Sequence, residues 1–248
     1  MLGSFTGPID RVVKMQYAQY EWVRLTMELF RRSKGFSWGI LYWMLNDCWP
    51  ASGWSLIDYY GFPKAAYYAL KRSAKGVIAA IEKKHRNYCV WICNDTLSAV
   101  SGMGRLRLCT PEGEQCGWDF AYRCGANVSQ CVFEIPAGLA EQQLQANALL
   151  LCDLENDRTI YTERSPAFLR LPKPELCVER TGGSLLRITA KSFLYAVMLD
   201  GDCVFEENCF LMLPGEVREI GFTAETEKAK KIEVYVPGWN GVQTVDCG

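Results

Sequence analysis

The chain has 248 residues, and its 27 lysines and arginines nearly balance 28 aspartates and glutamates, which leaves a net charge of -1. Its 49% of hydrophobic residues can bury a substantial core, which excludes an intrinsically disordered chain. The charge balance gives no reason to expect nucleic acid or a membrane as partner, and no apolar run approaches the about 20 residues that span a bilayer.

The first predicted element is an amphipathic helix that begins at Pro8 and ends before Gly35. Proline suits the first helical turn, and glycine is favoured just after the last one. Gln16 is the one polar exception in an apolar stripe whose steps of four and three residues match one helix face. The apolar members of this stripe are Ile9, Val13, Tyr20, Val23, Met27 and Phe30.

Residues 36–45 are apolar on both alternating faces, which predicts a strand buried on both sides, as in a parallel sheet or a barrel. Residues 46–55 form a predicted loop that is dense in turn residues and tryptophan. Loops at the carboxyl ends of such strands commonly carry function. A second helix is predicted over 64–73, so the first 75 residues form an αβα segment.

From Gly76 the apolar period changes to two, and turn residues separate short runs, which is typical of β-sandwiches. Leu171-Pro-Lys-Pro174 is a short stiff linker, because each proline fixes its own φ. We therefore expect three domains, over 1–75, 76–171 and 172–248. The predicted strands are 77–81, 88–93, 105–109, 115–123, 128–135 and 148–154 before the linker, and 175–179, 185–189, 194–199, 203–205, 210–213, 217–222 and 232–236 after it.

The αβα segment is too short to be a barrel. A (β/α)8 barrel takes roughly 250 residues, whereas 75 residues precede the predicted β-domains. The segment therefore either packs against the first sandwich, or the chain is the C-terminal part of a longer protein. In the second case Met1 is not the natural start.

Twelve cysteines are spread along the chain, but none forms a Cys-x-x-Cys pair, and His85 is the single histidine. This pattern argues against a zinc site, and we predict no metal and no other cofactor. Trp91 alternates with Cys89 and Cys93 in an apolar run, where all three are expected to be core residues. Residues 1–13 lack the regions of a signal peptide, so we expect a cytoplasmic protein with reduced thiols.

Residues 19–68 contain two long motifs, Tyr-Trp-x-Leu-Asn-Asp-x-Trp-Pro from Tyr42 and Trp-Ser-x-Ile-Asp-Tyr-x-Gly-x-x-Lys-x-x-Tyr-Tyr from Trp54. They resemble the last helix, last barrel strand and exit of the β-mannosidase branch of glycoside hydrolase family 2. Residues 168–174 and 204–216 are similar to the linker and last immunoglobulin-like domain of those enzymes. The resemblance implies a mainly β fold: two tandem immunoglobulin-like β-sandwiches preceded by the last α/β unit of an incomplete (β/α)8 barrel.

The resemblance also implies a retaining exo-β-mannosidase-like hydrolase, in which one glutamate is the acid/base and another the nucleophile. In the family both glutamates lie on earlier barrel strands, and these 248 residues contain no Asn-Glu or Ser-Glu-Phe-Gly motif. This chain alone is therefore expected to be inactive. The alternatives are an exo-β-glucosaminidase, which closely resembles the same branch, and a stand-alone carbohydrate-binding or scaffold module.

Five residues near the end of the predicted strand are candidate substrate-binding residues. Trp43 either stacks against the non-reducing sugar, as the resemblance implies, or belongs to the barrel core. Asp47 either accepts hydrogen bonds from sugar hydroxyls or caps the turn, and Asn46 either orients substrate or holds the turn. Trp49 and Trp54 either line the pocket mouth or pin the loop.

The expected partner of the full-length enzyme is a carbohydrate, either a terminal β-mannoside or a related glycoside. An αβα segment without the rest of a barrel also leaves apolar faces uncovered over residues 9–75. We expect this segment to dock on the first sandwich or to pair with a second copy of the chain.

Overall fold

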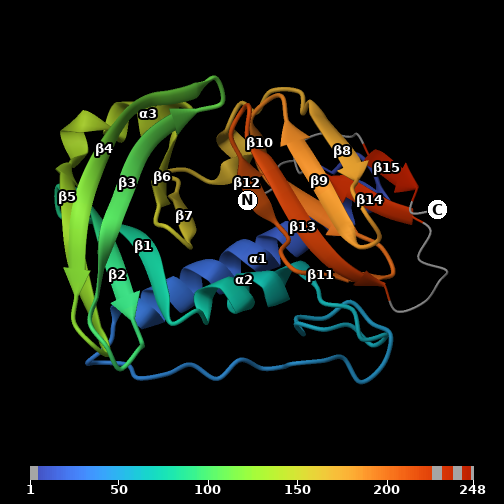
Figure 1. Ribbon diagram of the computed structural model, residues 1–248, viewed down its shortest axis with the longest axis horizontal. Helices are drawn as coiled ribbons and strands as arrows, with labels where there is room; N and C mark the ends of the chain where they lie inside the picture. Colours follow the sequence, from blue (N-terminus) through green and yellow to red (C-terminus); the bar gives the residue numbers. More distant parts are fainter. Residues whose placement is uncertain (1–4, 225–230, 237–241, 247–248) are drawn as a thin grey trace. The chain divides into compact units, whose positions relative to one another are not determined.

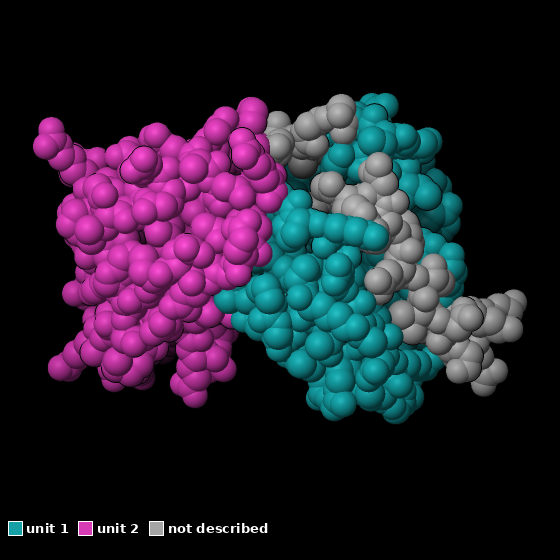
Figure 2. All heavy atoms as spheres, turned by 90° about the horizontal axis from the view of Figure 1, so that it is seen from above, with its two compact units in different colours: residues 1–23, 42–69, 171–248 teal, residues 24–41, 70–170 magenta. Residues whose placement is uncertain are grey.

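The computed structural model describes residues 5–224, 231–236 and 242–246. The chain forms two compact units, neither of which is one continuous stretch of sequence (Figure 1, Figure 2). It passes from one unit to the other inside two helices, α1 (Pro8–Arg32) and α2 (Ala65–Ser73). Unit 1 contains residues 1–23, 42–69 and 171–248, and unit 2 contains residues 24–41 and 70–170.

Helix α1 confirms the predicted helix. Gly35, just after its end, has a φ of 101°, a left-handed conformation that glycine adopts at little cost. The predicted stripe is buried in the middle of the helix and exposed at its two ends. Its buried members are Val13, Tyr20, Val23 and Met27, and its exposed members are Ile9 and Phe30.

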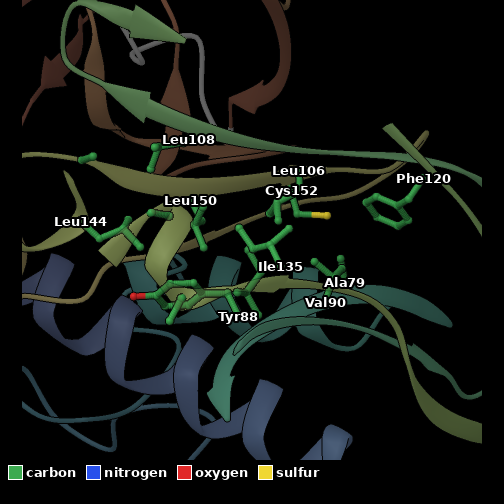
Figure 3. Packing of buried hydrophobic residues seen from close by; sticks show 14 residues of the cluster. Ala79, Tyr88, Val90, Leu106, Leu108, Phe120, Ile135, Leu144, Leu150 and Cys152 are labelled. Carbon is green, nitrogen blue, oxygen red and sulfur yellow. The ribbon is translucent and has the colours of Figure 1, made fainter. Parts of the chain in front are cut away.

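Unit 2 contains two antiparallel sheets that share one core (Figure 3). The strand orders are β1-β2-β5 and β4-β3-β6-β7. Tyr88 and Val90 on β2 lie in the same cluster as Leu106 and Leu108 on β3, as their period of two predicts. The strands are β1 (Val77–Lys84), β2 (Asn87–Asn94), β3 (Val100–Thr110), β4 (Gly113–Cys124), β5 (Val128–Pro136), β6 (Leu149–Asp153) and β7 (Arg158–Tyr161).

Three short helical segments complete unit 2, and none of them was predicted. Helix α3 (Glu141–Ala146) places Leu144 in the core of the two sheets. The 3-10 turns are η1 (Ala137–Leu139) and η2 (Pro166–Phe168). Strand β7 was also missed.

Unit 1 contains two further antiparallel sheets, with the orders β12-β10-β14-β15 and β11-β13-β9-β8. Strand β10 is buried at every position except its last, because it lies between two neighbours and packs against α1. Tyr195 on β10 meets Tyr17 of α1 edge-on, with ring centroids 5.6 Å apart. The strands are β8 (Leu176–Arg180), β9 (Leu185–Ala190), β10 (Leu194–Asp200), β11 (Cys203–Phe205), β12 (Phe210–Met212), β13 (Val217–Ala224), β14 (Lys231–Tyr235) and β15 (Val242–Asp246).

Two sequence predictions are wrong. Residues 37–42 have no regular structure, because a strand needs a hydrogen-bonded neighbour and none of the described strands pairs with this segment. Leu41, expected to be buried, is 100% exposed. Trp91 is partly buried and lies outside the core cluster, although Cys89 and Cys93, which alternate with it on β2, are buried.

Candidate functional site

The tryptophan-rich loop of residues 46–55 lies in unit 1 and is closed at its base by backbone hydrogen bonds. The amide of Ile57 donates to the carbonyl of Leu45 at 2.8 Å, and the amide of Asp47 donates to the carbonyl of Ile57 at 3.1 Å. Asn46 and Ile57 form an isolated parallel bridge. The loop therefore begins and ends at one point, as a compact surface loop does.

A buried ion pair holds the inside of this loop. Lys64, the residue before α2, donates from Nζ to Oδ2 of Asp47 at 2.5 Å and to Oγ of Ser55 at 2.7 Å. Asp47 is only 8% exposed. The hydrogen bonds from Lys64 and Ser55 hold the pKa of Asp47 below its ordinary value, so this carboxylate stays ionised at neutral pH.

Two glutamines of α1 anchor the loop and the helix that follows it. Gln19 donates from Nε2 to the carbonyl of Trp54 at 2.7 Å, and the hydroxyl of Tyr42 donates to the same carbonyl at 2.7 Å. Oε1 of Gln16 accepts the amide of Ala65 at 3.0 Å, which satisfies a free N–H at the start of α2. The polar exception in the apolar stripe of α1 is thus the residue that caps α2.

The three tryptophans predicted to contact substrate all expose their side chains. Trp43 is 79% exposed and precedes the loop, where its peptide bond to Met44 is cis. Trp49 and Trp54 are also exposed. Hydrogen bonds fix the backbone of this segment, while its indole rings remain exposed to solvent.

The five predicted residues therefore divide into two groups. Asp47 points inward to Lys64, whereas Asn46 is exposed and donates from Nδ2 to the carbonyl of Asp47 at 3.2 Å. The alternative roles of Asp47 and Asn46 at the turn are supported by these contacts, and their contact with a sugar stays a prediction. The tryptophans remain candidates for substrate contact.

Sequence reasoning missed Lys64 and Gln19 as parts of this arrangement. A lysine at the start of a helix opposes the helix dipole, which favours anions there, so it needs a carboxylate partner. That argument marks Lys64 as a candidate for an ion pair but does not identify Asp47 as its partner. The role of Gln19 has no such local signal, because it depends on the position of a carbonyl 35 residues away.

Unit 1 also contains a cavity of about 360 Å³ beside the loop. Val12 and Gln16 of α1, Phe62 and Lys64 of the following segment, and Asp200 of β10 contribute to its lining. None of the five predicted substrate-binding residues lines it. The cavity is therefore distinct from the surface that carries the tryptophans.

Within the described ranges, no helix combines the length and the apolar character that crossing a membrane requires.

Comparison with known proteins gives a family match and matches to individual relatives. Residues 171–236 match the Ig_mannosidase family, an Ig-fold domain. β-Mannosidase B of Emericella nidulans is 33% identical over 82 residues, and an exo-β-D-glucosaminidase of Amycolatopsis orientalis is 39% identical over 105 residues. These matches cover 28% and 41% of this chain, and 10% of each relative.

Solved structures share the fold over almost the whole chain. A β-D-mannosidase from Dictyoglomus thermophilum matches 94% of this chain with a TM-score of 0.81 and 24% identity. An exo-chitosanase from Amycolatopsis orientalis matches 98% of it with a TM-score of 0.75 and 20% identity. The chain covers 31% and 35% of those two proteins.

Proposed function

We propose, from the homology of this chain to the C-terminal part of the β-mannosidase branch of glycoside hydrolase family 2, that it supplies one end of a retaining exo-β-mannosidase-like hydrolase. In this proposal residues 1–75 correspond to the last α/β unit of a (β/α)8 barrel, and its segment 36–45 pairs with none of the described strands because its barrel neighbours belong to the rest of the enzyme. Residues 76–171 and 172–248 are two tandem immunoglobulin-like sandwiches.

The observation that carries the proposal is the construction of the tryptophan loop. Its motif residues are held by a buried Asp47–Lys64 pair and by Gln19 of α1, while the indole rings face outward. A plain connector needs no such support. In a barrel, a loop of this kind lies at the carboxyl end of a strand, where active sites form.

The roles proposed for the residues follow from their exposure. Trp43 forms the floor of the subsite for the terminal sugar, because a flat aromatic face packs against the C–H face of a sugar and excludes water. Trp49 and Trp54 line the mouth of the pocket, and Asn46 is the polar contact. Asp47 is a positioning residue, since Lys64 and Ser55 already engage it.

The chemistry itself belongs to residues that this chain does not provide. Retaining hydrolysis needs two carboxyl groups about 5–5.5 Å apart, one as acid/base and one as nucleophile. The 248 residues contain neither family motif for these glutamates. Asp47 is ion-paired and is therefore a poor substitute. We propose that the chain alone is inactive and that the complete enzyme needs no cofactor.

The proposed substrate is a terminal β-mannoside. A second candidate, a terminal β-glucosaminide, is favoured by the 39% identity over 105 residues to the Amycolatopsis orientalis exo-β-D-glucosaminidase. The cytoplasm remains the proposed compartment, because all eleven cysteines in the described ranges are free thiols.

The exposed apolar residues of segment 36–45 support a further part of this proposal, which concerns what covers that segment. Phe36 and Leu41, of the segment predicted to be a barrel strand, are 95% and 100% exposed, so they do not dock on the sheets of unit 2. We propose that the other barrel units cover this segment in the full-length enzyme. In the isolated chain a second copy covers it.

The experiment is an assay of two proteins with p-nitrophenyl β-mannoside and p-nitrophenyl β-glucosaminide. One is this chain, and the other is the product of the reading frame extended upstream of Met1 in the source DNA. We expect no hydrolysis by the chain and hydrolysis of one substrate by the longer product. Hydrolysis by the chain itself, or a stop codon immediately upstream, would refute the proposal.

A matched pair of variants in the longer product tests the subsite. Trp43→Ala removes the proposed sugar platform and should lower kcat/KM by about tenfold to a hundredfold, the effect of ~1.4–2.7 kcal/mol of lost binding. Trp91→Ala removes an indole on β2 and should leave kcat/KM unchanged. Equal effects of the two substitutions would exclude a role for Trp43 in substrate binding.

A further inference from the structure

Two thiols and a carboxylate converge on one face of the three-stranded sheet of unit 2. Sγ of Cys89, Sγ of Cys131 and a carboxylate oxygen of Glu134 all lie within 4.8 Å of one another. Cys89 is on β2, and Cys131 and Glu134 are on its neighbour β5. Sγ of Cys131 lies 3.4 Å from Oε1 of Glu134.

An irregularity in β5 creates this convergence. In a regular strand, residues three apart point to opposite faces, so Cys131 and Glu134 would be separated by the sheet. The pairing with β2 shifts between Val90 and Trp91, so that Val132 has no partner. Because of this extra residue, which makes the irregularity a β-bulge, Cys131 and Glu134 point to the same face of the sheet. Bulges that redirect a side chain are common beside functional sites.

The surroundings favour an ionised carboxylate and protonated thiols in the absence of a ligand. Nδ2 of Asn87 donates to Oε2 of Glu134 at 2.7 Å, and the hydrogen bonds from Asn87 and Cys131 lower the pKa of Glu134. Burial raises the pKa of Cys89, and burial together with the hydrogen bond to Glu134 raises that of Cys131 to about 12. A cation that binds here must therefore displace the thiol protons.

We propose that Cys89, Cys131 and Glu134 form a binding site for a soft divalent cation, with zinc as its occupant. Two thiolates and one carboxylate are ligands that zinc accepts in tetrahedral sites, and water supplies the fourth position. Binding forms two S–Zn bonds and one O–Zn bond and releases both thiol protons to solvent. Asn87 orients the carboxylate of Glu134 by a hydrogen bond to Oε2, as outer-sphere residues commonly do for metal ligands.

The exposures of the three groups allow a metal to enter from solvent. Cys89 is 2% exposed, Cys131 is half-buried and Glu134 is exposed. The cation would join β2 to β5, which is an edge strand of its sheet. The site belongs to unit 2, whereas the tryptophan loop belongs to unit 1, and this inference does not depend on the proposed hydrolase function.

The experiment measures alkylation of single cysteines by iodoacetamide in the reduced 248-residue chain, with and without zinc sulfate, by peptide mass spectrometry. At a free zinc concentration ten times the dissociation constant, Cys131 should react about tenfold more slowly. Cys116, an exposed thiol on β4, should react at the same rate with and without zinc. Apparent affinity should increase as pH rises, because two protons leave.

Two variants connect the protection to the proposed ligands. Glu134→Gln keeps the shape of the side chain and should weaken zinc protection of Cys131 by about tenfold or more. Cys131→Ser should abolish the thiolate-to-metal absorption band that Co²⁺ produces in the unmodified chain. Circular dichroism checks that both variants are folded. Equal protection of Cys116, an unchanged zinc affinity in Glu134→Gln, or a Cys89–Cys131 disulfide that persists under reducing conditions would overturn the proposal.

Discussion

Arg72 of α2 donates from Nη1 to the carboxylate of Glu28 of α1 at 2.7 Å, within unit 2. Glu28 is 1% exposed and also accepts hydrogen bonds from Thr159 on β7, at 2.9 Å, and from Arg24, at 3.2 Å. Arg72 in turn pairs with Asp157 at 2.8 Å. This network ties both helices to the strands of unit 2, and every charge in it has a partner of opposite sign.

Glu28→Gln should destabilise the chain by about 3 kcal/mol, because it leaves Arg24 and Arg72 with less negative charge inside a buried network. Urea unfolding followed by circular dichroism measures the change. The control is Glu219→Gln, which breaks an exposed pair with Arg187 and should cost less than about 1 kcal/mol. Similar losses of unfolding free energy in the two variants would contradict the claim that the buried ion pairs of Glu28 stabilise the chain more than an exposed pair does.

The stability contributed by Glu28 should disappear in acid. Burial alone would raise its pKa, but the charges of Arg24 and Arg72 outweigh burial and hold the pKa below its ordinary value. A carboxylate whose pKa is lowered by folding stabilises the native state above its ordinary pKa and loses this effect as pH falls through the lower, folded value. The difference in unfolding free energy between wild type and Glu28→Gln should therefore be largest near neutral pH and narrow below about pH 4. A difference that grows on acidification would contradict this sign.

Lys64→Met should release the tryptophan loop. The pKa of Asp47 should rise towards its ordinary value, because the hydrogen bond from Lys64 is the largest cause of its lowering. Carboxyl NMR titration measures this pKa, and limited proteolysis over residues 46–55 reports the loosening of the loop. Lys71→Met, an exposed position on α2, is the control and should change neither reading. An unaltered Asp47 pKa in Lys64→Met would show that another group holds this carboxylate.

The isolated chain should self-associate through the segment that contains Phe36 and Leu41. Both side chains are almost fully exposed, and burying a large apolar side chain gains about 1.5–3 kcal/mol. Size-exclusion chromatography with light scattering should show a dimer or larger species for the unmodified chain. Phe36→Lys combined with Leu41→Lys should shift it to monomer. A monomeric unmodified chain at high concentration would rule out pairing through this segment.

Most strands could be predicted from the sequence because their side chains alternate between the two faces of a sheet. This rule identified β9, in which Leu186 and Ile188 are fully buried and Arg187 between them is exposed. It failed for residues 36–45. Their apolar pattern on both faces is typical of a strand buried on both sides, but such a strand forms only where neighbouring strands are present to pair with it. The period is a property of the segment, whereas strand pairing is a property of the surrounding chain.

The candidate site was predictable in its location but not in its internal contacts. The motif from Tyr42 identified the loop, and Trp43 is exposed, while its contact with a sugar stays a prediction. The partner of Asp47 lies 17 residues further along the chain, so the pair depends on how the loop closes. The bulge that brings Cys131 beside Glu134 is equally invisible to a rule of strict alternation.

The passage of the chain between units inside α1 separates in time the synthesis of the two main parts of unit 1. The first half of α1 leaves the ribosome about 150 residues before the strands of unit 1 that follow residue 170. At about 5–20 residues per second, Tyr17 waits roughly 9 to 36 seconds for Tyr195. Unit 2 is synthesised completely in this interval. Unit 2 therefore has the opportunity to fold before the parts of unit 1 that contain Tyr17 and Tyr195 can pack together.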